Sequence, residues 1–209
     1  MVAVLDYGAG NLTSVLLALE HLGAEVKICP DADAVAGADR IIFPGVGSAG
    51  SGMEQVRARG FDQVIVEAAK TDRPVLAICL GMQLLFEFSE EDGGVAGLGV
   101  LPGAVRKFSF ADKSVKVPHM GWNPVRIAAP HALWKSIPDE SAFYFVHSFY
   151  VESHDEKAIA GKTEYAGFTF TSAAARGNLF ATQFHPERSG KTGLQLLKNF
   201  LNQEPKSCC

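Results

Sequence analysis

Cys79, His185 and Glu187 are the residues of this sequence whose types and spacing best suit nucleophilic chemistry. In such a set a cysteine attacks a carbonyl carbon, a histidine moves the protons, and a carboxylate orients the imidazole. His185 and Glu187 flank Pro186, which disfavours helix, and in extended backbone their side chains would point the same way. A lone histidine is more often just a satisfied polar residue, so the pairing with Cys79 carries the hypothesis of acyl transfer.

The sequence around Cys79 predicts how that thiol is held. Residues 74–78 form a short apolar run, typical of a buried strand, and residues 80–85 show the apolar spacing of a helix. Cys79 would therefore occupy a sharp strand-to-helix turn, the setting of a nucleophile elbow, with Gly81 letting the helix pack closely. The positive end of the helix favours thiolate over thiol. Without this context, a free cysteine is usually a buried structural residue.

Acyl transfer also needs N–H donors for the developing oxyanion. The N–H of Leu80, directly after the nucleophile, is one candidate. We expect the second from residues 44–47, Pro-Gly-Val-Gly, where Val46 and Gly47 are placed for it. The glycines allow a peptide to turn over, so this donor would be aimed correctly in only one state. Taken alone, the stretch reads equally well as a plain turn.

The elements that must position these residues predict a mixed α/β fold. Strand and helix alternate in the first half, which indicates a mainly parallel central sheet flanked by helices. After Gly93 and Gly94 the segments are short and β-like, which indicates additional antiparallel strands in the C-terminal half. The expected strands are 2–6, 25–29, 39–43 and 74–78, then 104–108, 125–127, 142–146, 149–152, 158–162, 169–173 and 179–184, and the expected helices are 12–22, 53–70 and 191–201.

Ligands of parallel sheets bind outside the carboxyl ends of the strands, so the loops at those ends predict the site. Residues 6–11, residues 44–48 and Cys79 all follow predicted strands and should converge. The glycines of 7–11 lack the full dinucleotide pattern and a Walker lysine, which favours a tight strand-to-helix connection over a phosphate site. We expect one domain over 1–203 and a polar tail over 204–209.

Composition narrows the class of protein. The chain has 209 residues, 47% of them hydrophobic and 20% charged, with a net charge of -4, which suits a packed core and gives no sign of nucleic-acid binding. No apolar run is long enough for a membrane span, and no secretory signal is evident. Cys29, Cys79, Cys208 and Cys209 show no metal-ligand spacing, so we expect neither metal nor cofactor and a reducing cytoplasm.

Two motifs together resemble a known family. Residues 77–83, Ala-Ile-Cys-Leu-Gly-Met-Gln, and residues 184–187, Phe-His-Pro-Glu, are similar to those of the class I (triad) glutamine amidotransferases. Residues 6–12, Asp-Tyr-Gly-Ala-Gly-Asn-Leu, and 118–123, Pro-His-Met-Gly-Trp-Asn, narrow the match. With 44–47 they resemble the branch that supplies the glutaminase subunits of imidazole glycerol phosphate synthases in histidine biosynthesis. Ala77, two residues before Cys79, stands where the usual elbow motif has glycine, which is a mild departure from that motif.

The resemblance implies an activity and a partner. Cys79 would attack the side-chain amide of glutamine, His185 would protonate the leaving ammonia, and a cyclase subunit with a (β/α)₈ barrel would receive it in a heterodimer. The cyclase would then make imidazole glycerol phosphate and an aminoimidazole carboxamide ribotide. The resemblance assigns Gln83, Glu91, Gly47, Ser148 and Phe149 to glutamine binding, and Asn11, Trp122, Asn123, Tyr144 and Arg188 to the partner interface.

Other readings stay open at this point. The chain could serve another class I system, although Val46 and residues 118–123 argue against those for pyridoxal phosphate, purine or anthranilate synthesis. It could be a free-standing cysteine hydrolase, such as a γ-glutamyl peptidase. It could also be a regulatory subunit without activity. Glutamine hydrolysis by the chain alone and with a candidate cyclase plus its nucleotide ligand would separate these alternatives.

Overall fold

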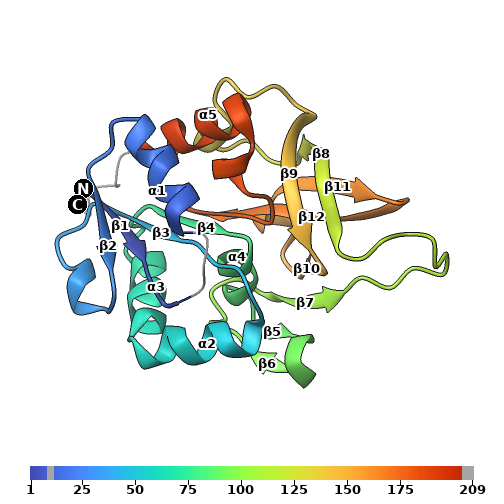
Figure 1. The fold of residues 1–209 in the computed structure, drawn as a ribbon, viewed down its shortest axis with the longest axis horizontal. Coiled ribbons are helices and arrows are strands. Elements are labelled where there is room, and N and C mark those ends of the chain that lie inside the picture. The colour runs from blue at the N-terminus through green and yellow to red at the C-terminus, as the bar shows by residue number, and fades with distance from the viewer. Residues whose placement is uncertain (9–11, 204–209) are drawn as a thin grey trace.

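The computed structural model describes residues 1–8 and 12–203, and it is built on one long twisted sheet with helices on both faces (Figure 1). Asn11 and the expected tail 204–209, with Cys208 and Cys209, lie outside the described residues. The strands are β1 (Val2–Leu5), β2 (Val26–Cys29), β3 (Arg40–Phe43), β4 (Val75–Ile78), β5 (Phe88–Ser89), β6 (Val95–Ala96), β7 (Gly103–Lys107), β8 (His119–Ile127), β9 (Ser141–His147), β10 (Phe149–Ser153), β11 (Ile159–Tyr165), β12 (Phe168–Arg176) and β13 (Leu179–Thr182). The helices are α1 (Leu12–His21), α2 (Ala49–Ala58), α3 (Phe61–Lys70), α4 (Leu80–Leu84) and α5 (Gly190–Leu201).

The sheet has a parallel half and a mainly antiparallel half, in which β5 and β7 pair parallel. Its main path runs β2-β1-β3-β4-β13-β12-β10-β7-β5-β6, and β11, β8 and β9 extend it from β12. Neighbours from β2 to β13 are parallel, and β12 pairs antiparallel with β13, β10 and β11. This confirms the predicted mixed α/β fold.

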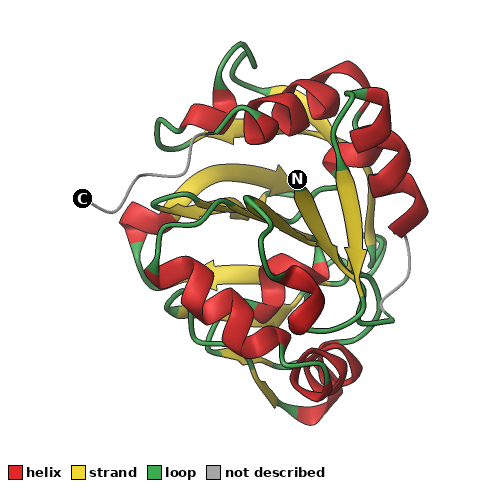
Figure 2. Ribbon diagram, turned by 90° about the vertical axis from the view of Figure 1, so that its left-hand side faces the viewer, coloured by secondary structure: helices red, strands yellow, loops and turns green. Residues whose placement is uncertain are grey.

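The inner parallel strands β1 and β4 are apolar throughout because both of their faces are covered. Side chains alternate between two hydrophobic clusters, so Leu5 and Phe43 pack on the side of α2, α3 and α4. Val4 and Ile42 pack on the opposite side, against α1 and α5. Figure 2 shows helices lying on both sides of these strands. The two clusters hold the strand ends, and hence the loops that follow them, in fixed positions.

Two elements differ from the sequence expectation. The helical region expected over 53–70 begins earlier, at Ala49, and consists of two helices, α2 and α3, because Gly60 takes a left-handed conformation (φ 71°) between them. The last expected antiparallel strand, β13, is antiparallel only to β12 and runs parallel to β4. All four residues of β13 are buried, since this strand joins the two halves of the sheet.

The strand order places the loops that follow β1, β3 and β4 at one edge of the sheet. β1 lies between β2 and β3, so the order reverses there, and the carboxyl ends of β1, β3 and β4 face the same way. Such a reversal opens a crevice beyond the strand ends. β13 ends at the same edge, directly before residues 183–187. In the part of the chain that the structure describes, no helix is long and apolar enough to cross a membrane.

Candidate active site

Cys79 lies at the turn between β4 and α4, as the sequence predicts. Its backbone has φ 54° and ψ -106°, a conformation that L-residues rarely adopt, and its N–H donates to the Thr182 carbonyl at 2.7 Å. A Cβ on Gly81 would lie 2.0 Å from the carbonyl oxygen of Phe43, so only glycine lets α4 begin this close to β3. The tight turn brings the thiol to the end of the sheet, where it is 7% exposed.

His185 and Glu187 form a buried pair behind Cys79. The imidazole Nδ1 lies 2.8 Å from Glu187 Oε1, and the two side chains are 2% and 0% exposed. The expected contact between the two side chains is present, but the prediction of extended backbone over residues 185–187 is wrong. Residues 186–188 form a 3₁₀ turn with Pro186 at its start, where proline's fixed φ is tolerated, and this turn rather than a strand aims the carboxylate at the ring.

The protonation of His185 depends on two anions. Burial alone would lower the pKa of the imidazole, but the thiolate charge of Cys79 and the hydrogen-bonded carboxylate of Glu187 outweigh it and raise that pKa to about 10. Nε2 is buried without a hydrogen-bond partner among the described residues, and it is the ring atom left for the thiol or for a leaving group. The arrangement therefore suits a cysteine-histidine pair in which the histidine carries a proton.

A cavity of about 390 Å³ opens in front of Cys79. It brings together the thiol, the predicted oxyanion donors and the predicted glutamine contacts. Its lining residues are Val46, Gly47, Cys79, Leu80, Gln83, Glu91, Pro118, Val146, His147, Ser148 and Phe149. Residues separated by as much as a hundred positions in sequence thus share one pocket at the predicted edge of the sheet.

Of two hydrogen-bonded glutamines, Gln83 and Gln183, the second contacts the thiol on its buried side. Gln83 Nε2 donates to the Phe149 carbonyl at 3.1 Å and to Gln183 Oε1 at 3.0 Å. Gln183, which is fully buried, in turn donates from Nε2 to Cys79 Sγ at 3.7 Å. Gln183 is not among the site residues that the sequence predicts. Its position two residues before His185 could have revealed it, since side chains two apart in extended chain share a side.

Glu91 connects the cavity to the start of α2. Its Oε2 accepts from the N–H of Ala49 at 2.8 Å, and the neighbouring Asp92 accepts from the N–H of Gly50 at 2.9 Å. These carboxylates satisfy donors that a helix start leaves unpaired. Burial raises the pKa of Glu91, although the Ala49 hydrogen bond opposes that rise. Because α2 directly follows residues 44–48, Glu91 touches both the cavity and the loop beside it.

One of the predicted oxyanion donors, the N–H of Leu80, is already engaged in this structure. The N–H of Leu80 donates to the Gly45 carbonyl oxygen at 3.2 Å, so this carbonyl occupies the donor that an oxyanion would need. Val46 and Gly47 line the cavity as predicted. Turning the Gly45–Val46 peptide over would remove the carbonyl and present the Val46 N–H on the same side. The loop is therefore in a blocked orientation, in which the Gly45 carbonyl occupies the Leu80 N–H.

Two of the residues expected at a partner interface, Trp122 and Asn123, lie on opposite faces of β8. Trp122 is 57% exposed, and its ring lies 6.1 Å from that of Tyr144. Arg188 is exposed and directly precedes Ser189, whose hydroxyl accepts from the Tyr144 N–H at 3.0 Å. Asn123 points to the opposite face, because neighbours in a strand alternate. Its Nδ2 contacts His119 Nε2 at 3.0 Å and the Glu164 carbonyl at 3.2 Å.

A buried hydrogen-bond chain leads from Asn123 to the cavity. His119 Nδ1 lies 2.9 Å from His147 Nε2, and His147 Nδ1 lies 2.7 Å from the Phe149 carbonyl, which also accepts from Gln83. The carbonyl can only accept, so each histidine carries its proton on Nδ1 and accepts on Nε2. Burial lowers the pKa of His119 to about 4 and that of His147 to about 3, so both rings are neutral near pH 7.

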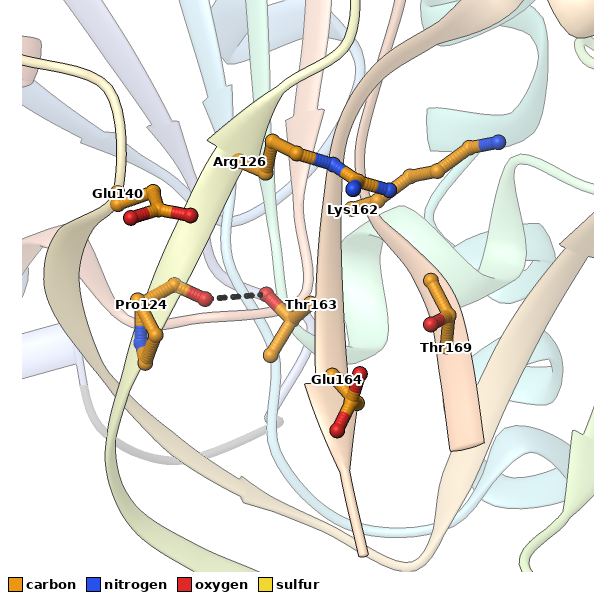
Figure 3. Close-up of a pocket in the computed structure, with 7 residues that line it drawn as sticks. All are labelled: Pro124, Arg126, Glu140, Lys162, Thr163, Glu164 and Thr169. Carbon is orange, nitrogen blue, oxygen red and sulfur yellow. Dashed lines mark hydrogen bonds between the residues drawn. The ribbon is translucent and has the colours of Figure 1, made fainter. Parts of the chain in front are cut away.

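A separate depression, of about 130 Å³, lies over β8, β11 and β12 and contains none of the predicted site residues (Figure 3). Arg126 and Lys162 are register partners across β8 and β11, and Glu140 and Glu164 line the same hollow. The Thr163 hydroxyl donates to the Pro124 carbonyl at 3.1 Å. This is a solvated surface of mixed charge, apart from the chemistry around Cys79.

Comparisons with known proteins agree with this geometry. The family described as glutamine amidotransferase class-I matches residues 3–203. The chain is 50% identical over 204 residues to the imidazole glycerol phosphate synthase subunit HisH of Pseudomonas syringae pv. syringae, which covers 95% of both chains. It is 51% identical over 201 residues to the HisH subunit of Acinetobacter baylyi, with 96% of this chain and 97% of that one covered. Among solved structures, PurLQS from Thermotoga maritima matches with a TM-score of 0.75 at 20% identity, covering 96% of this chain and 97% of that one.

Proposed function

The chain belongs to the class I glutamine amidotransferase family, and from that premise we propose that it is the glutaminase subunit of an imidazole glycerol phosphate synthase, acting in histidine biosynthesis. It hydrolyses glutamine to glutamate and ammonia. One observation carries the assignment. Cys79 lies in a constrained turn at the cavity, and His185, whose Nδ1 is 2.8 Å from Glu187 Oε1, lies behind it.

We propose the following chemistry for this geometry. Cys79 Sγ attacks the side-chain amide carbon of glutamine, and the carbonyl π electrons move to oxygen. His185 gives its Nε2 proton to the leaving nitrogen. As the carbonyl bond re-forms, the carbon–nitrogen bond breaks, ammonia departs, and Cys79 is left joined to the substrate as a thioester. His185 then takes a proton from water as the water attacks the thioester, and glutamate departs from the regenerated thiolate. Glu187 keeps the ring oriented and its positive charge balanced.

Gln83, Glu91, Ser148 and Phe149 are the proposed glutamine contacts. Their support is that all four line the cavity in front of the thiol. A carboxylate at Glu91 suits the α-ammonium group of the substrate, and backbone groups at 148–149 suit its polar ends. Gln183 is a positioning residue in this scheme, since its amide holds the sulfur from the buried side.

The oxyanion hole is proposed to form only when the loop turns over. Leu80 and Val46 are the donors, with Gly47 supplying the flexibility, and the Leu80–Gly45 hydrogen bond is the contact that must break. A missing oxyanion donor costs about 10² to 10³ in rate. This blocked loop also favours a subunit under a partner's control over a free-standing cysteine hydrolase, which would need its donors available at all times.

The partner is proposed to be a cyclase subunit with a (β/α)₈ barrel, forming a heterodimer that receives ammonia. Exposed Trp122 with Tyr144 and Arg188 supports a docking face, and Asn11 stays part of that proposal from the sequence alone. Asn123 would act from the inner face of β8, through His119 and His147, toward the glutamine cavity. A reactive thiol needs a reducing compartment, so the proposal places the protein in the cytoplasm.

A comparison of nitrogen sources tests this function. The complex is assayed for imidazole glycerol phosphate with glutamine or with an ammonium salt, using the wild-type chain and Cys79→Ala. The proposal predicts that Cys79→Ala loses glutamine-dependent synthesis and keeps ammonium-dependent synthesis, because the cyclase site lies on the other chain. Glutamine-dependent synthesis by Cys79→Ala would refute the assigned nucleophile. A wild-type chain that supports neither route would refute the function.

A further inference from the structure

Tyr7, two residues after the end of β1, carries a buried hydroxyl that the chemistry above does not use. The side chain is 1% exposed, and its hydroxyl has no hydrogen-bond partner among the described residues. Burial raises the pKa of this phenol well above its usual range, and the charge of Cys79 raises it further, so the group stays a neutral donor. A buried hydroxyl without a partner is unfavourable, and its persistence in a site calls for a reason.

The hydroxyl lies against the loop that blocks the oxyanion donors. A Cβ built on Gly45 would be 1.9 Å from the Tyr7 oxygen, so the hydroxyl touches the backbone of Gly45 itself. A second cavity, of about 210 Å³, lies between Tyr7 and the loop and is lined in part by Val46, Gly47 and Ser48. Val46 and Gly47 therefore separate this space from the glutamine cavity, and the peptide has room to move.

The Gly45 carbonyl needs a new donor once the peptide turns over. In the present orientation it accepts from the Leu80 N–H. Gly45 is buried, so a carbonyl released from Leu80 would otherwise be left without a partner, which proteins rarely tolerate. The Tyr7 hydroxyl is the side-chain donor that already contacts this residue.

We propose that Tyr7 is a positioning residue for glutamine hydrolysis, whose hydroxyl donates to the Gly45 carbonyl in the turned-over loop and so holds the Val46 N–H toward the oxyanion. This rests on the proposed function, because it requires glutaminase activity that the loop controls. The hydroxyl is unpaired in the blocked orientation and paired in the competent one. It therefore favours the competent orientation without touching substrate.

Tyr7→Phe tests the inference, since it removes the hydroxyl and keeps the ring. Glutamine turnover is measured in the complex with the cyclase, with and without the nucleotide ligand, and thermal unfolding is measured on the same proteins. We expect kcat in the presence of ligand to fall about tenfold, the effect of one neutral hydrogen bond, with KM for glutamine unchanged. We expect the melting temperature to stay the same or rise, because the blocked orientation loses no bond.

Tyr165→Phe is the matched control. Its hydroxyl donates to the Lys116 carbonyl at 2.9 Å in this structure, so its loss should lower the melting temperature and leave the ligand-stimulated kcat unchanged. Ligand-stimulated kcat in Tyr7→Phe equal to the wild type, or a lower melting temperature with raised KM, would overturn the inference and leave the proposed function standing. A wild-type complex without glutaminase activity would instead overturn the proposed function itself.

Discussion

The N–H of Leu80 donates to the carbonyl oxygen of Gly45 at 3.2 Å, and this hydrogen bond sets the state of the site. Leu80 follows the proposed nucleophile, so its N–H is the donor that an oxyanion would use first. The blocking group comes from a different strand end, after β3, and its neighbour Val46 carries the second proposed donor. On the proposed function, one peptide would thus control both donors.

Gly45→Ala should test how closely that peptide is held. Its Cβ would lie 1.9 Å from the Tyr7 oxygen and 3.2 Å from Leu80 Cβ, so we expect the free energy of unfolding to fall by about 1 to 3 kcal/mol from overpacking. In a Tyr7→Phe background the nearest ring atom would be Cζ at 3.1 Å, so the loss should be smaller. Urea unfolding of the two single variants and the double variant gives the coupling, and strict additivity would contradict the contact.

Cys79 should make the chain less stable than glycine would at the same position. Its φ of 54° is strained for any residue with a side chain, at a cost of about 1 to 3 kcal/mol. We therefore expect Cys79→Gly to have a higher free energy of unfolding than Cys79→Ala by roughly 1 kcal/mol, and both to lack glutaminase activity. Denaturant unfolding with matched slopes measures the difference. An alanine variant as stable as the glycine variant would show that the elbow is unstrained.

His185 and Glu187 should differ in how much they contribute to turnover. His185→Ala removes proton transfer, which is commonly worth about 10² to 10⁴ in rate. Glu187→Gln keeps an oxygen that can accept from Nδ1 but removes the charge that helps to raise the pKa of His185. We expect a smaller loss of kcat for Glu187→Gln in the complex. Equal or reversed losses would contradict the division of roles.

The elbow and its distant histidine could be predicted from the sequence because their signals are local. A short apolar run, a cysteine and a helical pattern indicate the turn at Cys79, and the His-Pro-Glu motif supplies His185 and Glu187. The geometry behind the second motif could not be predicted, because the turn after Pro186 depends on packing: Ser189, buried beneath it, donates from Oγ to the His185 carbonyl at 2.6 Å.

Other parts of the site depend on long-range contacts that no local pattern records. Gln183 contacts Cys79 only because β13 pairs with β4, and that parallel pairing was missed. The inward direction of Asn123 follows from the register of β8 and from its bond to His119. The blocked state of Leu80 likewise follows from where the loop after β3 comes to lie.

The buried histidine pair should make stability depend on acid. The folded-state pKa values of His119 and His147, about 4 and about 3, lie below the ordinary value of 6.5, so the unfolded chain binds more protons between those limits. The contribution of this pair to stability is therefore fully present above about pH 6.5 and is lost as pH is lowered toward 4. Each proton contributes at most about 1.4 kcal/mol per pH unit.

Unfolding of the wild type, His147→Gln and His154→Gln between pH 7 and 5 measures this dependence. We expect His147→Gln to reduce the slope of unfolding free energy against pH, whatever its stability at pH 7. His154 is exposed and serves as the control, whose replacement should keep the wild-type slope. A His147→Gln slope equal to that of the wild type would show that the pair does not titrate in this range.

Glutamine turnover in three mixtures tests the central claim most directly: the chain alone, the chain with the cyclase, and both with the cyclase's nucleotide ligand. The blocked Leu80 donor predicts poor turnover by the chain alone and a rise of about 10² to 10³ in kcat with cyclase and ligand, the effect of completing an oxyanion hole. Such a rise lies within what a ligand that favours one loop orientation can provide. Full activity in the chain alone would contradict the account.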